Sequence, residues 1–220
     1  MEDNTEEKQQ TSPYDAFWIM QKKALRHSFI NSTMVILNII IFVICVFTGS
    51  LLYQKGALIL ENVRAGEYYR LVTAMFLHGD LQHILGNMML LVFMGSMVEE
   101  YIGHIQYFIL YFIAGIGGNI LSLWYESLKG LSWYSYGASG AAFGIIGAFL
   151  VIIIIGRKTL RKGTGILIRT LLLVAFSIYS SFADANVNYA AHIGGLVFGM
   201  IFTGIISFGI RKQINLEEWI

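Results

Sequence analysis

A few polar residues interrupt the most apolar stretches of this 220-residue chain, and their types suit peptide hydrolysis. Ser139 lies in YSYGASGAAFG, and its hydroxyl becomes a nucleophile once a base takes its proton. His192, in AHIGGLVFG, is the candidate base. His83 and Asn87 are four positions apart, so they share one helix face, where both could donate to an oxyanion together with the Ser139 backbone N–H.

Taken singly, each residue has a structural explanation. A serine in a membrane helix commonly bonds to a carbonyl one turn earlier. A histidine at a helix start is often interfacial, and an asparagine can join two helices. Taken together they form a site. No buried aspartate completes a triad, because Asp80 and Asp184 fall in predicted loops, so the sequence predicts a Ser–His dyad.

Composition predicts an integral membrane protein. Hydrophobic residues make up 56% of the chain and charged residues 13%, about half the soluble average of roughly 25%. A net charge of +1 gives no argument for a nucleic-acid partner. The single cysteine excludes an internal disulfide, and no metal or other cofactor is expected.

Six segments are apolar enough to cross a bilayer, at 32–52, 83–102, 105–125, 139–156, 164–182 and 191–210. They predict an all-α polytopic protein, a six-transmembrane-helix bundle. The expected organisation is an N-terminal tail over 1–28, a membrane domain over 29–212 and a C-terminal tail over 213–220. We expect both tails to be short and cytoplasmic.

Basic residues set the orientation. Clusters within 22–26, 157–162 and 211–212 fall on one side of six spans, so both termini are predicted to be cytoplasmic. The expected location is a cell membrane, which the protein crosses several times. Six spans with no additional helix are typical of a protein of the bacterial plasma membrane.

The polar residues fall at one depth. At about 1.5 Å per helical residue, Ser139 lies about 27 Å from the basic cluster that begins at residue 157. His192 lies about 28 Å from the cluster that begins at residue 211. His83 lies about 24 Å above Glu99, with Asn87 one turn deeper. Side chains from three helices therefore reach the same outer level.

Small residues explain how the helices could meet. Gly140, Gly144 and Gly147 line one side of the fourth predicted helix, and Gly195 and Gly199 form a small-xxx-small pair on the sixth. Such surfaces allow two helix backbones to approach closely. We expect this contact to bring the serine and the histidine within hydrogen-bond distance.

Three motifs together carry a family resemblance: HILGN at 83–87, GASG at 137–140 and AHIGGLVFG at 191–199. The set resembles the rhomboid family of intramembrane serine proteases. The resemblance implies a six-helix bundle with a water-filled cavity that opens to the outside. It also implies single-span membrane proteins as substrates, cut near the outer end of the span after local unwinding.

The resemblance also implies roles for single residues. Ser139 would be the nucleophile and His192 the general base, with the oxyanion hole formed by His83, Asn87 and the Ser139 amide. Gly137 and Gly140 flank this site and would leave room for a substrate backbone.

Further positions match the family less directly. Arg70 is the matching arginine of the loop before the second span, and Glu99 is expected to be structural. Phe143 stands where some members have tyrosine, and its ring could pack against the base. His78 matches a histidine often found near the mouth of the site, where it would contact water or substrate.

Three other functions agree less well with the sequence. A catalytically inactive relative would bind membrane proteins, but such relatives typically lose the serine or the histidine. A small transporter or channel would use His83, Asn87 and His192 to line a path, but neither repeats nor paired broken helices are evident. A metal site built from His78, His83 and His192 lacks helical spacing and a carboxylate.

Overall fold

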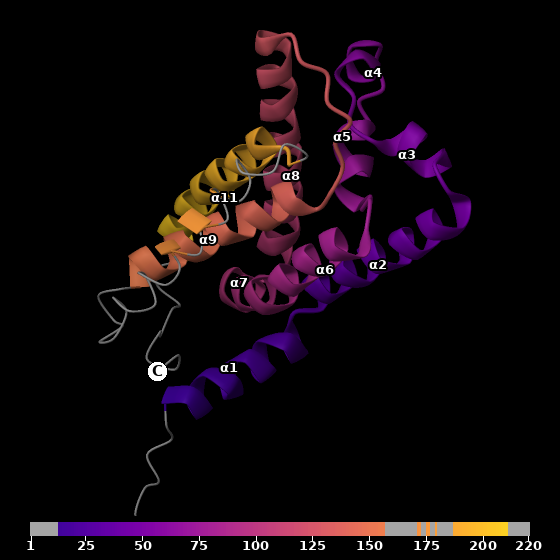
Figure 1. Cartoon of the computed structure of the whole chain (residues 1–220). Coiled ribbons are helices and arrows are strands. Elements are labelled where there is room, and N and C mark those ends of the chain that lie inside the picture. The colour runs from indigo at the N-terminus through magenta and orange to yellow at the C-terminus, as the bar shows by residue number, and fades with distance from the viewer. Residues whose placement is uncertain (1–12, 157–170, 173–174, 177–178, 180–186, 211–220) are drawn as a thin grey trace, which may run out of the picture.

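The computed structural model describes residues 13–156, 171–172, 175–176, 179 and 187–210. The described chain is helical (Figure 1). Its main helices are α1 (Pro13–His27), α2 (Phe29–Thr48), α6 (Leu81–Leu90), α7 (Ser96–Ile102), α8 (His104–Lys129), α9 (Ser139–Gly156) and α11 (Tyr189–Ile210). Short helices α3 (Leu51–Gly56), α4 (Leu60–Arg64), α5 (Arg70–Thr73) and the 3₁₀ turn η1 (Ala74–Phe76) lie between α2 and α6.

Within the described residues, four helices are long and apolar enough to cross a bilayer: Phe29–Thr48, Leu81–Ile102, His104–Lys129 and Tyr189–Ser207. The apolar helix Ser139–Ile155 is shorter. The predicted segment at 164–182 lies mostly outside the described residues. The chain is thus a helical membrane protein, and five of the six predicted segments are seen as helices.

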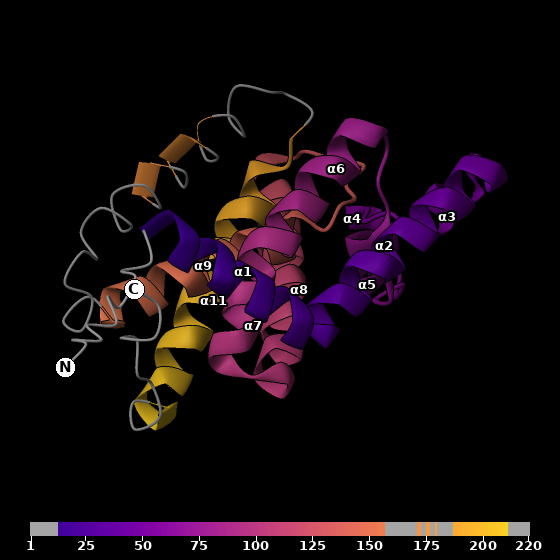
Figure 2. The same ribbon diagram turned by 90° about the horizontal axis from the view of Figure 1, so that it is seen from below.

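Helices α8, α9 and α11 form the most extensive contacts, and both views show α9 and α11 beside one another against α8 (Figures 1 and 2). Their backbones approach where side chains are smallest. A Cβ added to Gly118 of α8 would lie 2.5 Å from the carbonyl oxygen of Ala191 in α11. A Cβ on Gly199 would overlap the carbonyl of Gly144 in α9. The predicted glycine contact between the fourth and sixth segments is therefore present.

A π-helical turn, η2 (Leu91–Gly95), separates α6 from α7, and amide side chains satisfy its carbonyls. Asn31 of α2 donates to the Leu91 carbonyl at 2.9 Å, and Gln21 of α1 donates to the Phe93 carbonyl at 3.3 Å. The buried carboxylate of Glu99 accepts the backbone N–H of Asn31 and so caps the start of α2. Glu99 is thus part of the helix packing.

Arg70 organises the outer connection between α2 and α6. Its side chain is 3% exposed and donates to the backbone carbonyls of Ala57 at 2.7 Å and Gln54 at 3.0 Å. Its Nε forms an ion pair with Glu67 at 2.6 Å. Because one guanidinium joins three points of the chain, the short helices α3 to α5 form an ordered layer.

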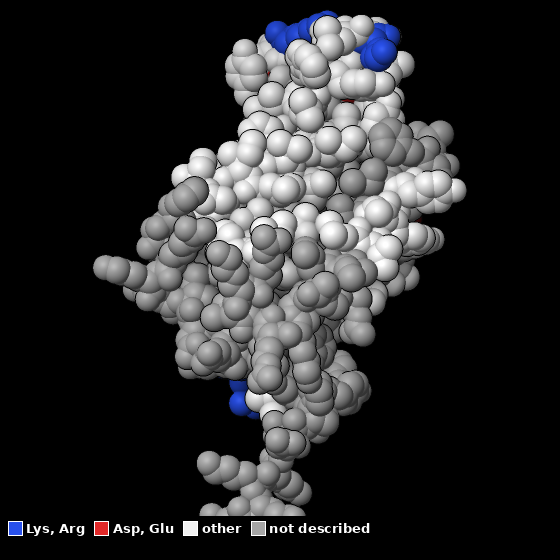
Figure 3. Space-filling view, turned by 90° about the vertical axis from the view of Figure 1, so that its left-hand side faces the viewer, with Lys and Arg blue, Asp and Glu red and all other residues white. Residues whose placement is uncertain are grey.

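The described surface in Figure 3 is largely free of charged side chains. Lys and Arg gather near its upper end, where Figure 1 places α4 and the end of α8, with others near its lower end. The broad described surface below the upper charged end carries almost no charge, which suits a chain that crosses a bilayer.

Candidate active site

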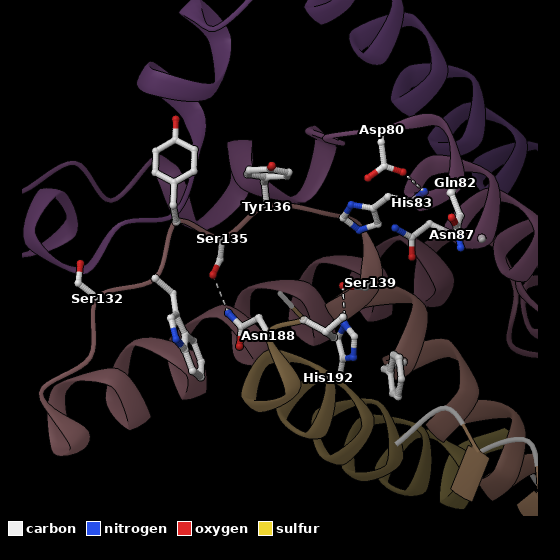
Figure 4. Close-up of a pocket in the computed structure, with 15 residues that line it drawn as sticks. Asp80, Gln82, His83, Asn87, Ser132, Ser135, Tyr136, Ser139, Asn188 and His192 are labelled. Atoms are coloured by element: carbon white, nitrogen blue, oxygen red, sulfur yellow. Dashed lines mark hydrogen bonds between the residues drawn. The ribbon is translucent and has the colours of Figure 1, made fainter. Parts of the chain in front are cut away.

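Ser139 and His192 are in direct contact. Ser139 is the first residue of α9, and His192 lies in the first turn of α11. The Ser139 Oγ and the His192 Nε2 are 2.8 Å apart, which is hydrogen-bond distance (Figure 4). The close glycine contact of α9 with α11, just below this pair, allows two short side chains to meet.

Phe143 fixes the imidazole from one side. It lies one turn after Ser139, and its ring stacks on the His192 ring with centroids 4.2 Å apart and planes 14° from parallel. His192 is only 8% exposed. The stacked ring restricts rotation of the imidazole and keeps Nε2 directed at the serine.

Donor groups face this pair from α6. Asp80 caps α6 by accepting the His83 backbone N–H at 2.8 Å, and this cap fixes the first turn of the helix. Asn87 follows one turn later on the same face. Its Nδ2 is buried and has no hydrogen-bond partner among the described residues, so a donor is available there.

Gly137 lies between the side chains of His83 and Ser139. Its φ of +140° is rarely adopted by residues with a side chain. A Cβ at this position would lie 2.7 Å from His83 Nε2 and 3.6 Å from Ser139 Oγ. The missing side chain therefore leaves open the space into which both groups project.

A cavity of about 840 Å³ opens above the Ser–His pair. Its walls come from α6, from the loop that precedes α9 and from the start of α11 (Figure 4). Asp80 is the only Asp or Glu among the described lining residues, and serine, asparagine and tyrosine side chains supply much of the wall. The cavity is large and polar enough to hold water beside Ser139.

Two predicted site residues lie away from the cavity wall. Arg70 supports the outer connection, as described above. His78 is fully buried, and its Nε2 accepts the Ala138 backbone N–H at 3.4 Å. This differs from the expected place at the mouth of the site, because the loop around Ala138 covers the ring. Burial, and secondarily the neighbouring His83, lower the pKa of His78 from 6.5 to about 3, so the ring is neutral.

The predicted glycines lie at or below the pair. Gly140 and Gly195 face one another directly beneath Ser139 and His192, and Gly199 packs one turn deeper. No group of three or more His, Cys, Asp or Glu side chains in the described part of the chain is arranged to hold a metal ion.

Several polar residues next to the site were not singled out from the sequence. They are Ser122 and Glu126 of α8, Ser135 of the loop before α9, and Asn188 before α11, all joined by hydrogen bonds. Of these, only Asn188 could have been found from the sequence, because asparagine is a preferred N-cap residue and here directly precedes α11.

Comparison with known proteins gives consistent matches. Residues 65–208, more than half of the chain, match the family described as Rhomboid domain. The chain is 33% identical over 142 residues to YdcA of Bacillus subtilis (strain 168), covering 64% of this chain and 69% of YdcA. It is 33% identical over 152 residues to Rhomboid protease GluP of the same organism, covering 68% of this chain and 28% of GluP. RHOMBOID-like protein 1 of Arabidopsis thaliana is 33% identical over 163 residues, which span 74% of this chain and 40% of that protein.

Proposed function

Because the chain belongs to the rhomboid family, we propose that it is an intramembrane serine endopeptidase with a Ser139–His192 dyad. The observation that carries the proposal is the 2.8 Å contact between the serine hydroxyl and the imidazole Nε2 beneath a polar cavity. That contact is what proton transfer from a nucleophile to a base requires.

The reaction would follow the acyl-transfer sequence. Ser139 Oγ attacks the carbonyl carbon of the scissile bond while His192 Nε2 takes its proton. The imidazolium then returns the proton to the leaving amine, which leaves an ester on the serine. A water molecule from the cavity, deprotonated by His192, attacks the ester, releases the acid and restores the hydroxyl.

Negative charge develops on the substrate oxygen in both steps and needs fixed donors. His83 and Asn87 from α6 and Ser139 from α9 line the same cavity from two sides, so the His83 side chain, the Asn87 Nδ2 and the Ser139 backbone N–H are the candidate donors (Figure 4). The Asn87 Nδ2, which has no partner among the residues that the structure describes, supports this role, because a buried donor without a partner is costly unless a ligand satisfies it.

The substrates would be single-span membrane proteins that enter from the lipid bilayer. A helix hides its carbonyls in its own hydrogen bonds, so the segment that reaches the serine must be unwound. Both termini of the chain would be cytoplasmic and the cavity would open on the outer side, in a bacterial plasma membrane. Relatives occur in a bacterium and in a plant.

The direct test is labelling by a fluorophosphonate of detergent-purified wild type, Ser139→Ala and His192→Ala. We expect wild type alone to be labelled, because the probe reacts with an activated serine and needs no knowledge of the substrate. Ser139→Ala should keep the wild-type unfolding temperature, because it removes only a hydroxyl. His192→Ala should unfold a few degrees lower and still fold, because it removes the buried ring that stacks on Phe143.

Cleavage of a model transmembrane segment in liposomes completes the test. We expect both substitutions to abolish turnover. Cleavage retained by either purified variant would refute the dyad, and a wild type inactive in both assays would indicate a protein that binds membrane segments without cutting them.

A further inference from the structure

A buried carboxylate lies at the outer end of α8, outside the proposed catalytic groups. Glu126 is 1% exposed, and no ion pair to it occurs in the described part of the chain. Its Oε1 accepts the Ser122 hydroxyl at 2.9 Å, and its Oε2 accepts the Trp133 backbone N–H at 3.1 Å. A buried carboxylate held only by neutral donors is costly to desolvate, so its presence needs a structural or functional reason.

The carboxylate connects to Asn188, the residue that starts α11. The Asn188 Nδ2 donates to Ser122 Oγ at 2.7 Å and to Ser135 Oγ at 2.9 Å (Figure 4 shows the second bond). Its Oδ1 accepts the Ala191 backbone N–H at 3.0 Å, which is an N-cap. Its backbone carbonyl accepts the His192 N–H at 3.3 Å. One residue therefore caps the helix and holds the backbone of the proposed base.

The donors in this chain of hydrogen bonds can point only one way. The Asn188 oxygen must face the Ala191 N–H, so its NH₂ group faces the two serines. Ser122 then accepts from Asn188 and gives its own proton to Glu126. Both oxygens of Glu126 accept, one from the Ser122 hydroxyl and one from the Trp133 N–H, so the carboxylate fixes the direction of the Ser122 hydroxyl.

The backbone segments that carry Ser139 and His192 are both bonded to this network. Ser135 precedes Ser139 by four residues, Asn188 precedes His192 by four residues, and the Ser135–Asn188 bond ties the two segments together. The Trp133 N–H holds the same loop to the carboxylate. We propose that Glu126 is a positioning residue that sets the Ser139–His192 geometry through Ser122 and Asn188; this inference rests on the proposed function.

The test compares Glu126→Gln with Glu61→Gln. Glutamine keeps the size of Glu126 but adds a donor where only acceptors fit, so the orientation of Ser122 is no longer fixed. Glu61 is a matched control because it accepts the hydroxyl of Ser132, in the same loop, at 3.0 Å, without contact to Asn188. Labelling rate, kcat, KM and thermal unfolding are measured for each purified protein.

We expect Glu126→Gln to lower kcat and the fluorophosphonate labelling rate by about 10- to 100-fold, with KM changed less than about 3-fold, because geometry at the reacting atoms governs kcat. Glu61→Gln should stay within about 2-fold of wild type. In the Asn188→Ala background, Glu126→Gln should have almost no further effect, because the link is already broken.

Additive effects of the two substitutions, or a labelling rate for Glu126→Gln equal to that of wild type, would overturn the inference. If Glu126→Gln does not fold, Ser122→Ala removes the same link, and a wild-type labelling rate in that variant would overturn it equally. Failure of the proposed function looks different, because the wild type itself would then neither label at Ser139 nor cleave.

Discussion

Gly195→Ala would test whether the α9–α11 contact sets the catalytic geometry. A Cβ on Gly195 overlaps the carbonyl oxygen of Gly140 and lies 2.8 Å from its carbonyl carbon. Carbon atoms pack at about 3.5–4.0 Å, so the two helices must separate by roughly 1 Å. Gly140 directly follows Ser139, and Gly195 lies one turn after His192, so this separation opens the dyad itself.

We expect Gly195→Ala to reduce the cleavage rate far more than the free energy of unfolding. Overpacking costs about 1–3 kcal/mol, and the better helix propensity of alanine recovers about 1 kcal/mol of it. The net loss of stability is then about 0–2 kcal/mol. The Ser139–His192 distance grows from 2.8 Å beyond hydrogen-bond range. A misplacement of about 1 Å at reacting groups lowers the rate about 100-fold.

The assay is cleavage of a model transmembrane segment in liposomes beside thermal unfolding in detergent. Gly204→Ala is the matched control, because it lies on the same helix and a Cβ there meets nothing within 4 Å. It should retain full activity and equal or exceed wild type in stability. A wild-type rate in Gly195→Ala would show that the helices accommodate the methyl group without moving the dyad, and the reasoning would fail.

Three further outcomes are expected. Asn87→Ala should lower kcat by about 100-fold or more with little change in KM, because its donor acts on charge that develops during the reaction; a change in KM alone would contradict this. Arg70→Lys should lower the free energy of unfolding by about 1.5–3 kcal/mol in thermal or denaturant unfolding, since one ammonium cannot reach both backbone carbonyls; an unchanged midpoint would show that water replaces the lost donor. The pKa of His78 is about 3 in the folded protein, below its ordinary value of 6.5. Between pH 6.5 and pH 3 the unfolded chain therefore binds a proton at His78 that the folded chain does not. As the pH decreases through this window, the free energy of unfolding falls. Wild type should therefore lose about 2 kcal/mol more than His78→Gln between pH 7 and pH 5, and equal losses would exclude a buried neutral imidazole.

The parts of the fold that depend on local pattern were predictable. The helix expected at 139–156 is α9, and the segment expected at 83–102 begins two residues earlier, where Asp80 caps it. Hydropathy and helix rise also placed the serine and the histidine at one depth, and the glycines predicted the close contact that joins them. Hydrophobic periodicity and segment length are enough to predict such features, because each feature depends on a pattern within a single helix.

The parts that depend on distant partners were not predictable. The Arg70 guanidinium bonds carbonyls 13 and 16 residues away, so no local pattern indicates the ordered layer of α3 to α5. The position of His78 follows from the Ala138 loop, 60 residues later, which covers its ring. The bond from Asn188 to Ser122 spans 66 residues. A lone serine or glutamate in an apolar helix carries no sign of such a partner.

The proposed dyad and the proposed oxyanion donors are supported by different contacts. Ser139 and His192 are held by the tight α9–α11–α8 packing and by the Asn188 network, whereas His83 and Asn87 belong to α6, which makes few contacts with α9. A small displacement of α6 would therefore change stabilisation of the oxyanion while the Ser–His hydrogen bond stays intact. The reverse holds for substitutions in the glycine contact, which disturb proton transfer and leave α6 in place. If the proposed function holds, two independently supported halves would allow the cavity between them to admit a substrate backbone without disturbing Ser139.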